Sequence, residues 1–164
     1  MGYRDMKIMI ISDTHKEKRN FYRVLEREGK IDMLVHCGDL SEDETVFQEM
    51  VGCPVEAVAG NMDFCSRLPG EKLFQIAGYK VFLTHGHLYG AHFDDTELIR
   101  AGEAEGADIV MYGHIHCPVL KKRENMVILN PGSISFPRQQ DRRPSYAIMN
   151  IDTEGKATYE IKYL

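Results

Sequence analysis

The most constraining feature of this chain is that apolar segments are repeatedly followed by short polar motifs. Five motifs combine Asp, Asn or His with small residues, and each follows or borders a segment with the composition of a β-strand. In open α/β sheets, ligands bind outside the carboxyl ends of the strands, where several loops converge. The pattern therefore predicts an α/β fold in which strand ends build one polar site. The motifs are Asp13-Thr14-His15, Gly38-Asp39, Gly60-Asn61-Met62-Asp63, His85-Gly86-His87 and Gly113-His114-Ile115-His116.

The order of the expected elements favours one domain over residues 1–164. Strands and helices alternate in the first half, whereas the second half consists mostly of strands. This order predicts α/β layers with parallel strands early and antiparallel strands late. The expected helices are Lys18–Glu28, a segment from Ser41, and Asp95–Glu105. The expected strands are Lys7–Ser12, Asp32–His36, Val55–Ala59, Lys72–Ile76, Lys80–Thr84, Ile109–Tyr112, Val119–Arg123, Val127–Leu129, Tyr146–Ile151 and Thr158–Tyr163.

Local signals refine some of these elements. Ser41, with Glu44 three residues later, has the sequence of a capping box, so the second helix is expected to begin there. Ala77-Gly78-Tyr79 separates two strand segments and predicts a hairpin. His36 lies within an apolar strand and is expected to be a hydrogen-bonded core histidine. His92 precedes the third helix and is expected to cap it.

The residue types in the five motifs are those that bind borderline and hard divalent metal ions. Asp13 and His15 are two residues apart, as are His114 and His116, so in extended backbone each pair projects to one side. Glycine beside the motifs permits tight turns where the backbone leaves the sheet. We interpret the motifs as a two-metal hydrolytic site.

Composition argues against several other classes of function. The formal net charge is −5, which disfavours a broad nucleic-acid surface, so a nucleic-acid partner is not expected. No apolar segment is long enough to cross a membrane. The four cysteines form no CxxC pair and are typical of reduced thiols. We therefore expect a cytoplasmic protein without a membrane partner.

The motifs D-x-H, G-D, G-N-x-D, H-G-H and G-H-x-H occur in the order found in the calcineurin-like metallophosphoesterases, and the chain resembles that family over most of its length. The short length, and the segment Asn130-Pro131-Gly132-Ser133 followed by Pro137-Arg138, are similar to the small bacterial and archaeal phosphodiesterase branch. The resemblance implies an α/β/β/α sandwich of two facing mixed β-sheets flanked by helices.

The resemblance also implies two divalent ions that share one ligand. The first ion would be held by Asp13, His15, Asp39 and His116, and the second by Asp39, Asn61, His85 and His114. The residues expected at the reacting centre are Asp39, Asn61, Asp63 and His87. His87 is expected either to steady a ligand or to contact phosphate.

Mixed nitrogen and oxygen ligation favours Mn²⁺ over Mg²⁺, with Fe²⁺, Co²⁺, Ni²⁺ or Zn²⁺ as alternatives. Two divalent ions carry roughly +4 charges, of which Asp13, Asp39 and a bridging hydroxide neutralise about three. The remaining charge suits a small phosphodiester monoanion. Ions about 3.5–4 Å apart can activate water as the nucleophile while they clamp the phosphate oxygens. We therefore expect direct hydrolysis of a small phosphodiester.

Met62 departs from the family pattern. Many relatives have His at this position of the G-N-x-D motif, where it is thought to protonate the leaving group while Asp63 orients it. A thioether has no proton to donate, so this general acid is absent. Alkyl phosphomonoesters, whose leaving groups most need a proton, are expected to be poor substrates. His87 and Cys65 are candidates to replace the acid.

Two alternative functions stay open. The same fold is used by a non-enzymatic scaffold, the metallophosphoesterase-like subunit of the retromer coat, whose metal ligands are incomplete. In this chain the whole proposed ligand set is present. Related enzymes also cut DNA, but the acidic balance argues against a nuclease. The sequence leaves open the natural substrate and whether the chain forms a homo-oligomer.

Overall fold

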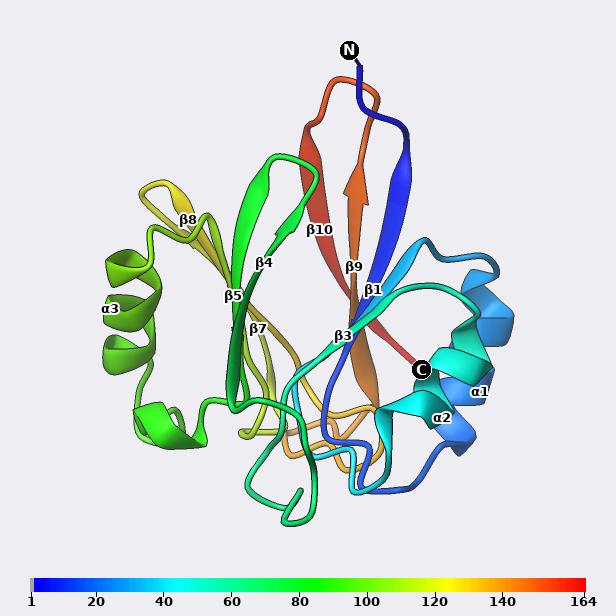
Figure 1. Cartoon of the computed structure of the whole chain (residues 1–164). Helices are drawn as coiled ribbons and strands as arrows, with labels where there is room; N and C mark the ends of the chain where they lie inside the picture. The colour runs from blue at the N-terminus through cyan, green and yellow to red at the C-terminus, as the bar shows by residue number, and fades with distance from the viewer. Residues whose placement is uncertain (1) are drawn as a thin grey trace.

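Two five-stranded β-sheets face each other in the computed structural model, which describes residues 2–164 (Figure 1). The first sheet has the strand order β10-β9-β1-β2-β3, and the second has β4-β5-β6-β8-β7. The strands are β1 (Met6–Ile11), β2 (Met33–His36), β3 (Val55–Ala57), β4 (Glu71–Ile76), β5 (Tyr79–Thr84), β6 (Ile109–Met111), β7 (Pro118–Arg123), β8 (Met126–Pro131), β9 (Ser145–Ile151) and β10 (Ala157–Tyr163).

Both sheets are mixed, with three parallel strands each. In the first sheet β1, β2 and β3 are parallel, whereas β9 runs antiparallel to β1 and β10 to β9. In the second sheet β5, β6 and β8 are parallel, and β4 and β7 are the antiparallel edges. The prediction of parallel strands early and antiparallel strands late is confirmed for β1–β3 and for β9 and β10, but it fails in the second sheet. Hairpins place an antiparallel strand early, at β4, and deliver a parallel strand late, at β8.

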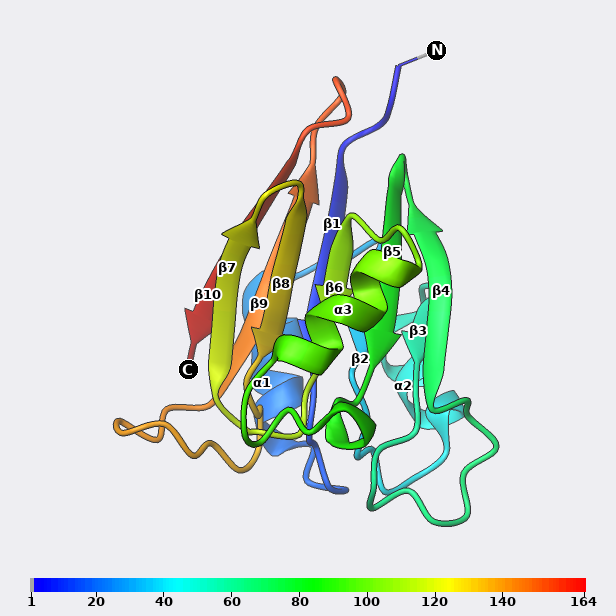
Figure 2. The same ribbon diagram turned by 90° about the vertical axis from the view of Figure 1, so that its left-hand side faces the viewer.

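Helices cover the outer faces of both sheets. The helices are α1 (Arg19–Glu28), α2 (Glu44–Val51) and α3 (Thr96–Ala104), with a short 3₁₀ helix, η1 (His87–Tyr89). Helices α1 and α2 pack on the first sheet and α3 on the second, as Figures 1 and 2 show. These layers confirm the predicted α/β/β/α sandwich. Within residues 2–164, no helix has the length and apolar character that crossing a membrane requires.

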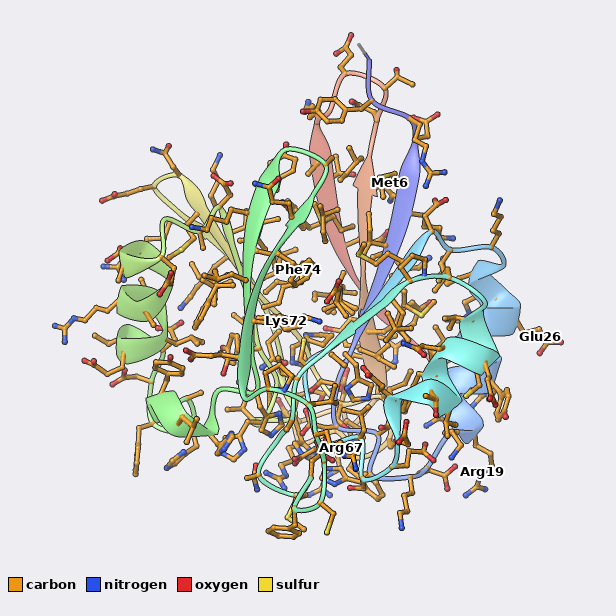
Figure 3. The ribbon with its side chains drawn as sticks, viewed as in Figure 1. Met6, Arg19, Glu26, Arg67, Lys72 and Phe74 are labelled. Carbon is orange, nitrogen blue, oxygen red and sulfur yellow. The ribbon has the colours of Figure 1, made fainter. Side chains whose placement is uncertain are left out.

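Alternating side chains build three layers of core. Between the sheets, Ile8 and Val35 of the first sheet share a buried cluster with Leu83 and Met111 of the second. Met6 and Phe74, labelled in Figure 3, pack against this cluster from β1 and β4. The other two clusters lie under the helices. Because each buried large aliphatic side chain contributes about 1.5–3 kcal/mol, these layers hold the strand ends in fixed positions.

Two local predictions had different outcomes. The hairpin is confirmed, with β5 beginning at Tyr79 after the turn at Ala77-Gly78. The second helix begins at Glu44 and not at Ser41, so the capping-box prediction is wrong. Asp43 is the N-cap, and its Oδ1 accepts a hydrogen bond from the Thr45 N–H at 2.9 Å. Ser41 instead has a left-handed φ of 58°.

Glu28 is a buried charge at the end of α1. Its side chain is 3% exposed and lies 2.6 Å from Lys7 Nζ and 2.5 Å from Lys162 Nζ. It also accepts a hydrogen bond from the Tyr146 hydroxyl at 2.6 Å. Burial alone would raise the pKa of Glu28, but these partners outweigh it and lower the pKa from 4.5 to about 2. The ionised carboxylate therefore ties α1 to β1, β9 and β10.

Replacing Glu28 with Gln is expected to lower the free energy of unfolding by about 2–3 kcal/mol at pH 7, because two lysines lose their counter-ion. Since the folded-state pKa is depressed, this contribution is complete above pH 4.5 and is lost as the pH falls toward 2. Urea unfolding of both proteins should show the difference shrinking to about half at pH 3. Glu26→Gln, at an exposed position of the same helix, is the control (Figure 3). A difference that stays constant with pH would contradict the assignment.

Candidate metal centre

Loops at the carboxyl ends of β1, β2, β3, β5 and β6 meet at the lower end of the view in Figure 1. Backbone hydrogen bonds join these loops, from the Asp13 N–H to the Gly38 carbonyl and from the Gly113 N–H to the His85 carbonyl. The two sheets are connected here as well, because the His114 N–H donates to Asp13 Oδ2 at 3.2 Å. The strand ends therefore bring the predicted polar residues to one place.

The backbone at this place is strained. Five of the seven predicted ligands have positive φ, although they are not glycine: Asp13, His15, Asp39, His114 and His116, with φ between 45° and 68°. Such residues cost roughly 1–3 kcal/mol each and persist where the surrounding structure fixes them. The expectation that the D-x-H and H-x-H pairs lie on extended backbone is therefore wrong. His114 and His116 join different groups of side chains.

Asp13, His15 and His116 form the first group. Asp13 Oδ1 lies 3.1 Å from His116 Nε2 and 3.8 Å from His15 Nε2. The other carboxylate oxygen, Oδ2, is held by the Ser12 hydroxyl at 2.6 Å. Asp13 Oδ1 and His15 Nε2 are buried, and neither forms a hydrogen bond. Two buried polar atoms without a hydrogen-bond partner among residues 2–164 are the strongest sign that this group binds a ligand.

Asn61, His85 and His114 form the second group. Asn61 Oδ1 lies 3.1 Å from both His85 Nε2 and His114 Nδ1. The rings of His85 and His114 are 5.2 Å apart at their centroids, in an edge-to-face arrangement. An amide oxygen and two imidazole nitrogens therefore face one another, as the ligands of one metal ion would.

Asp39 lies between the two groups. Its Oδ2 is 3.6 Å from His15 Nε2 in the first group and 3.4 Å from His85 Nε2 in the second. Its Oδ1 accepts a hydrogen bond from the Met62 N–H at 2.8 Å. One oxygen is therefore fixed by the backbone, and the other faces both groups.

Backbone carbonyls set the orientation of two of the imidazoles. His85 Nδ1 lies 2.7 Å from the Cys37 carbonyl, and His116 Nδ1 lies 2.6 Å from the Phe136 carbonyl. Because a carbonyl only accepts, each Nδ1 must carry a proton, and each Nε2 is the nitrogen that faces the carboxylates and is left for a metal ion or a second proton. Sequence reasoning missed these partners, because a carbonyl leaves no signal in the residue type.

The pKa values favour metal-binding protonation states for most of these donors. Burial would raise the pKa of Asp39, but His85 and the Met62 N–H lower it to about 2. Burial and the neighbouring His85 lower the pKa of His114 to about 4. Burial opposes the charged form of His85, yet Asp39 and Asp13 outweigh it and raise the pKa of this imidazole. A proton therefore competes with a metal ion for His85 up to a higher pH than at an ordinary imidazole.

Two glycines allow the backbone to approach the carboxylates. A Cβ at Gly60 would lie 2.0 Å from Asp39 Oδ1, and one at Gly113 would lie 2.9 Å from Asp13 Oδ2. Side chains at either position would displace the carboxylates. The close approach of the glycine backbone to the carboxylates, the buried polar atoms without hydrogen-bond partners among residues 2–164, and the mixture of carboxylate, amide and imidazole groups together fit divalent metal ions.

The other predicted residues lie close to the centre. Both carboxylate oxygens of Asp63 bind backbone N–H groups, of Leu40 and Gly60 at Oδ2 and of Ser41 at Oδ1. Asp63 therefore fastens the β2 and β3 loops together. His87 lies beside the second group, with its ring 5.4 Å from that of His85, and its buried Nδ1 has no hydrogen-bond partner.

The sequence also predicts the roles of two further histidines, His36 and His92. His36 is buried, its Nδ1 accepts from the Gly38 N–H, and its Nε2 lies 3.0 Å from Thr14 Oγ1. The prediction of a hydrogen-bonded core histidine is confirmed. His92 does not cap α3, because the Thr96 N–H donates to Asp94 Oδ1. Its ring instead lies 5.7 Å from that of His114.

Known proteins resemble this chain in sequence and in structure. Residues 6–154 match the model of the calcineurin-like phosphoesterase superfamily domain. A probable metallophosphoesterase from Methanothermobacter thermautotrophicus is 37% identical over 155 residues, covering 91% of this chain and 88% of the relative. Phosphodiesterase YfcE from Escherichia coli K12 is 30% identical over 172 residues, covering 90% and 89%.

The fold is also that of a solved Vps29 from Entamoeba histolytica in complex with Zn²⁺. The TM-score is 0.76 at 23% identity, and the match covers 96% of this chain and 99% of that one. This similarity shows the shared fold. The family-model match over residues 6–154 shows that the protein belongs to the calcineurin-like phosphoesterase superfamily.

Proposed function

We propose that this protein is a metal-dependent phosphodiesterase that hydrolyses a small phosphodiester at a dinuclear centre. The observation that carries the proposal is the division of seven donors into two groups that meet at Asp39 Oδ2. The first ion would be held by Asp13, His15, Asp39 and His116, and the second by Asp39, Asn61, His85 and His114. The name of the relative YfcE, a phosphodiesterase, supports a diester as the substrate.

Two bound ions, with Mn²⁺ expected in assays, would supply a hydroxide nucleophile near neutral pH and clamp the phosphate oxygens. The protein contributes a rigid frame. The Met62 N–H binds Oδ1 of Asp39, and the Ser12 hydroxyl binds Oδ2 of Asp13. The other oxygen of each carboxylate is thereby held toward the proposed ions. The ring of His87 lies beside the second group, and its Nδ1 has no hydrogen-bond partner among residues 2–164, so the neutral imidazole with its proton on Nδ1 would donate to a phosphate oxygen.

Hydrolysis of bis-p-nitrophenyl phosphate tests the proposal. Protein stripped with a chelator should be inactive, and added Mn²⁺ should restore turnover. Fe²⁺, Co²⁺, Ni²⁺ and Zn²⁺ are tested in parallel, because the donor set suits each of them. If the protein binds two ions but hydrolyses no substrate with any one of the five metals, the proposed enzymatic activity is refuted and the scaffold alternative is favoured.

Met62→His is expected to raise kcat on an alkyl phosphomonoester about tenfold more than on bis-p-nitrophenyl phosphate, because it supplies a proton donor. Met62 is 46% exposed and its N–H contacts Asp39, so the new imidazole would lie at the mouth of the centre. This is below the roughly 10²–10⁴-fold of a well-oriented general acid, because Asp63 already accepts three backbone N–H groups and is not free to orient the imidazole.

Met62→Gln, which is similar in size and has no acidic proton, is the control for this prediction. Metal content is measured for both variants. An equal change on the two substrates, with metal content intact, would mean that position 62 shapes the pocket and supplies no acid.

A further inference from the structure

The loop between β8 and β9, residues 132–144, crosses from the second sheet to the first at the end of the molecule that carries the centre (Figure 1). Ser133 fastens its start to the first group of donors. The Ser133 hydroxyl donates to the Asp13 carbonyl at 2.9 Å, and its oxygen accepts from the Phe136 N–H at 2.7 Å. The loop is therefore held in place beside Asp13, and Phe136 is held with it.

Phe136 contacts two imidazoles of the first group. Its carbonyl accepts from His116 Nδ1 at 2.6 Å, and the Arg138 N–H donates to the His116 carbonyl at 2.9 Å. Its ring lies 5.5 Å from the ring of His15, with the two planes at 76°. This separation and angle are those of a favourable edge-to-face pair. The backbone of Phe136 thus holds one imidazole and its side chain contacts the other.

His15 depends on such packing more than the other donors do. Its Nε2 forms no hydrogen bond within residues 2–164, and no backbone carbonyl of these residues binds its ring as one binds His85 and another binds His116. The main chain of His15 is fixed, because its N–H donates to the Asp39 carbonyl at 3.0 Å. The imidazole itself lies between two rings, those of Phe136 and His116, the second at 5.4 Å. Ring packing therefore sets its orientation.

We propose that Phe136 is a positioning residue for the first ion, and that its ring holds the His15 imidazole with Nε2 aimed at Asp13 and Asp39. The inference rests on the proposed function, because it concerns the loading of one of the two proposed ions. Outer groups that orient a ligand raise metal affinity, since the ligand need not be ordered when the ion binds. Among residues 2–164, His15 is the only proposed ligand whose ring pairs with Phe136, so one ion alone depends on this contact.

Titration of Mn²⁺ into chelator-stripped protein, followed by calorimetry, tests the proposal. Phe136→Ala should weaken one of the two ions about tenfold and leave the other within about twofold. The carbonyl that holds His116 stays in this variant, so the loss reports on the ring. Phe136→Tyr should bind both ions within about twofold of the unmodified protein. It keeps the ring, and Phe136 is 48% exposed, which leaves room for the hydroxyl in solvent.

A double substitution separates the contact with His15 from a general loosening of the loop. His15→Gln keeps a donor atom at the reach of Nε2 but has no ring. If Phe136 acts through His15, adding Phe136→Ala to this variant should change the Mn²⁺ affinities by less than about twofold.

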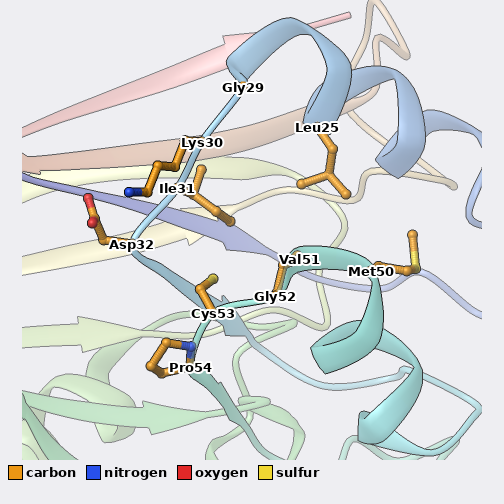
Figure 4. Close-up of a pocket in the computed structure, with 10 residues that line it drawn as sticks. All are labelled: Leu25, Gly29, Lys30, Ile31, Asp32, Met50, Val51, Gly52, Cys53 and Pro54. Carbon is orange, nitrogen blue, oxygen red and sulfur yellow. The ribbon is translucent and has the colours of Figure 1, made fainter.

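Two single substitutions serve as controls, and both should leave the Mn²⁺ affinities unchanged. Phe64→Ala removes an aromatic ring that is 82% exposed and pairs with no histidine among residues 2–164. Leu25→Ala removes an apolar side chain from the cavity of about 420 Å³ in Figure 4. That cavity is also lined by Ile31 and Cys53, at the amino ends of β2 and β3, and so lies away from the centre.

A Phe136→Ala protein that is folded by circular dichroism and binds both ions as before would overturn the proposal. So would an equal loss of affinity when Phe136→Ala is added to His15→Gln, or the same loss in Leu25→Ala. The two proposals fail separately. Uptake of two ions with hydrolysis, unchanged by Phe136→Ala, refutes only the positioning role. Uptake of two ions without hydrolysis, with one ion weakened by Phe136→Ala, refutes only the diesterase.

Discussion

Asp39→Asn is expected to lower kcat on bis-p-nitrophenyl phosphate by more than about a thousandfold at saturating Mn²⁺, which corresponds to a loss of about 4 kcal/mol in the transition state. Asp39 Oδ2 faces an imidazole of each group, at 3.6 Å and 3.4 Å, and lies closer to His85 of the second group than Asp13 Oδ1 does, at 3.8 Å. Loss of its charge removes a ligand from both proposed ions at once. Asp39→Ala should be inactive as well.

The Asn variant keeps the shape of the side chain and an oxygen for the Met62 N–H, so the fold is expected to persist. Bound Mn²⁺, measured by elemental analysis, should fall from two ions to one or none. Asp152→Asn, at an exposed position in the turn between β9 and β10, is the control for the same chemical change. Unchanged turnover of the Asp39 variants under saturating metal would refute the two-metal model.

The place of the site could be predicted from the sequence, because chain order alone puts polar residues after β1, β2, β3, β5 and β6. Parallel neighbouring strands end at the same edge, so residues as distant in sequence as Asp13 and His114 meet there. The sequence also predicts that glycine is needed beside the motifs. In the structure, a Cβ at Gly60 or Gly113 would lie too close to the carboxylate of Asp39 or Asp13. Residue type and strand periodicity carry this much information.

The details depend on backbone conformation, which the sequence pattern does not encode. Left-handed φ values at His114 and His116 send the two imidazoles to different groups, where extended backbone would have kept them together. The start of α2 was misplaced for a related reason. Asp63, more than twenty residues later, captures the Ser41 N–H and holds Ser41 outside the helix.

Metal affinity is expected to fall about tenfold for each pH unit below the raised pKa of His85, because a proton and a metal ion compete for Nε2. The sign follows from the direction of the shift. Asp39 and Asp13 hold the proton on His85 to a higher pH than usual, so the ion must displace it over a wider pH range than at an ordinary imidazole. Asp39, with a pKa of about 2, and His114, with a pKa of about 4, add no competition above pH 5.

Titration of Mn²⁺ followed by electron paramagnetic resonance at pH 5.5, 6.5, 7.5 and 8.5 measures this dependence. All four values lie above the range in which Glu28 loses its stabilising charge, so that loss does not contribute to the dependence. Hydrolysis should rise over the same range, because the nucleophile also requires loss of a proton. His85→Asn should bind metal more weakly and flatten the dependence, since an amide oxygen does not titrate. A flat dependence in the unmodified protein, or a hydrolysis optimum near pH 5, would contradict ligation by His85 and imply a different nucleophile.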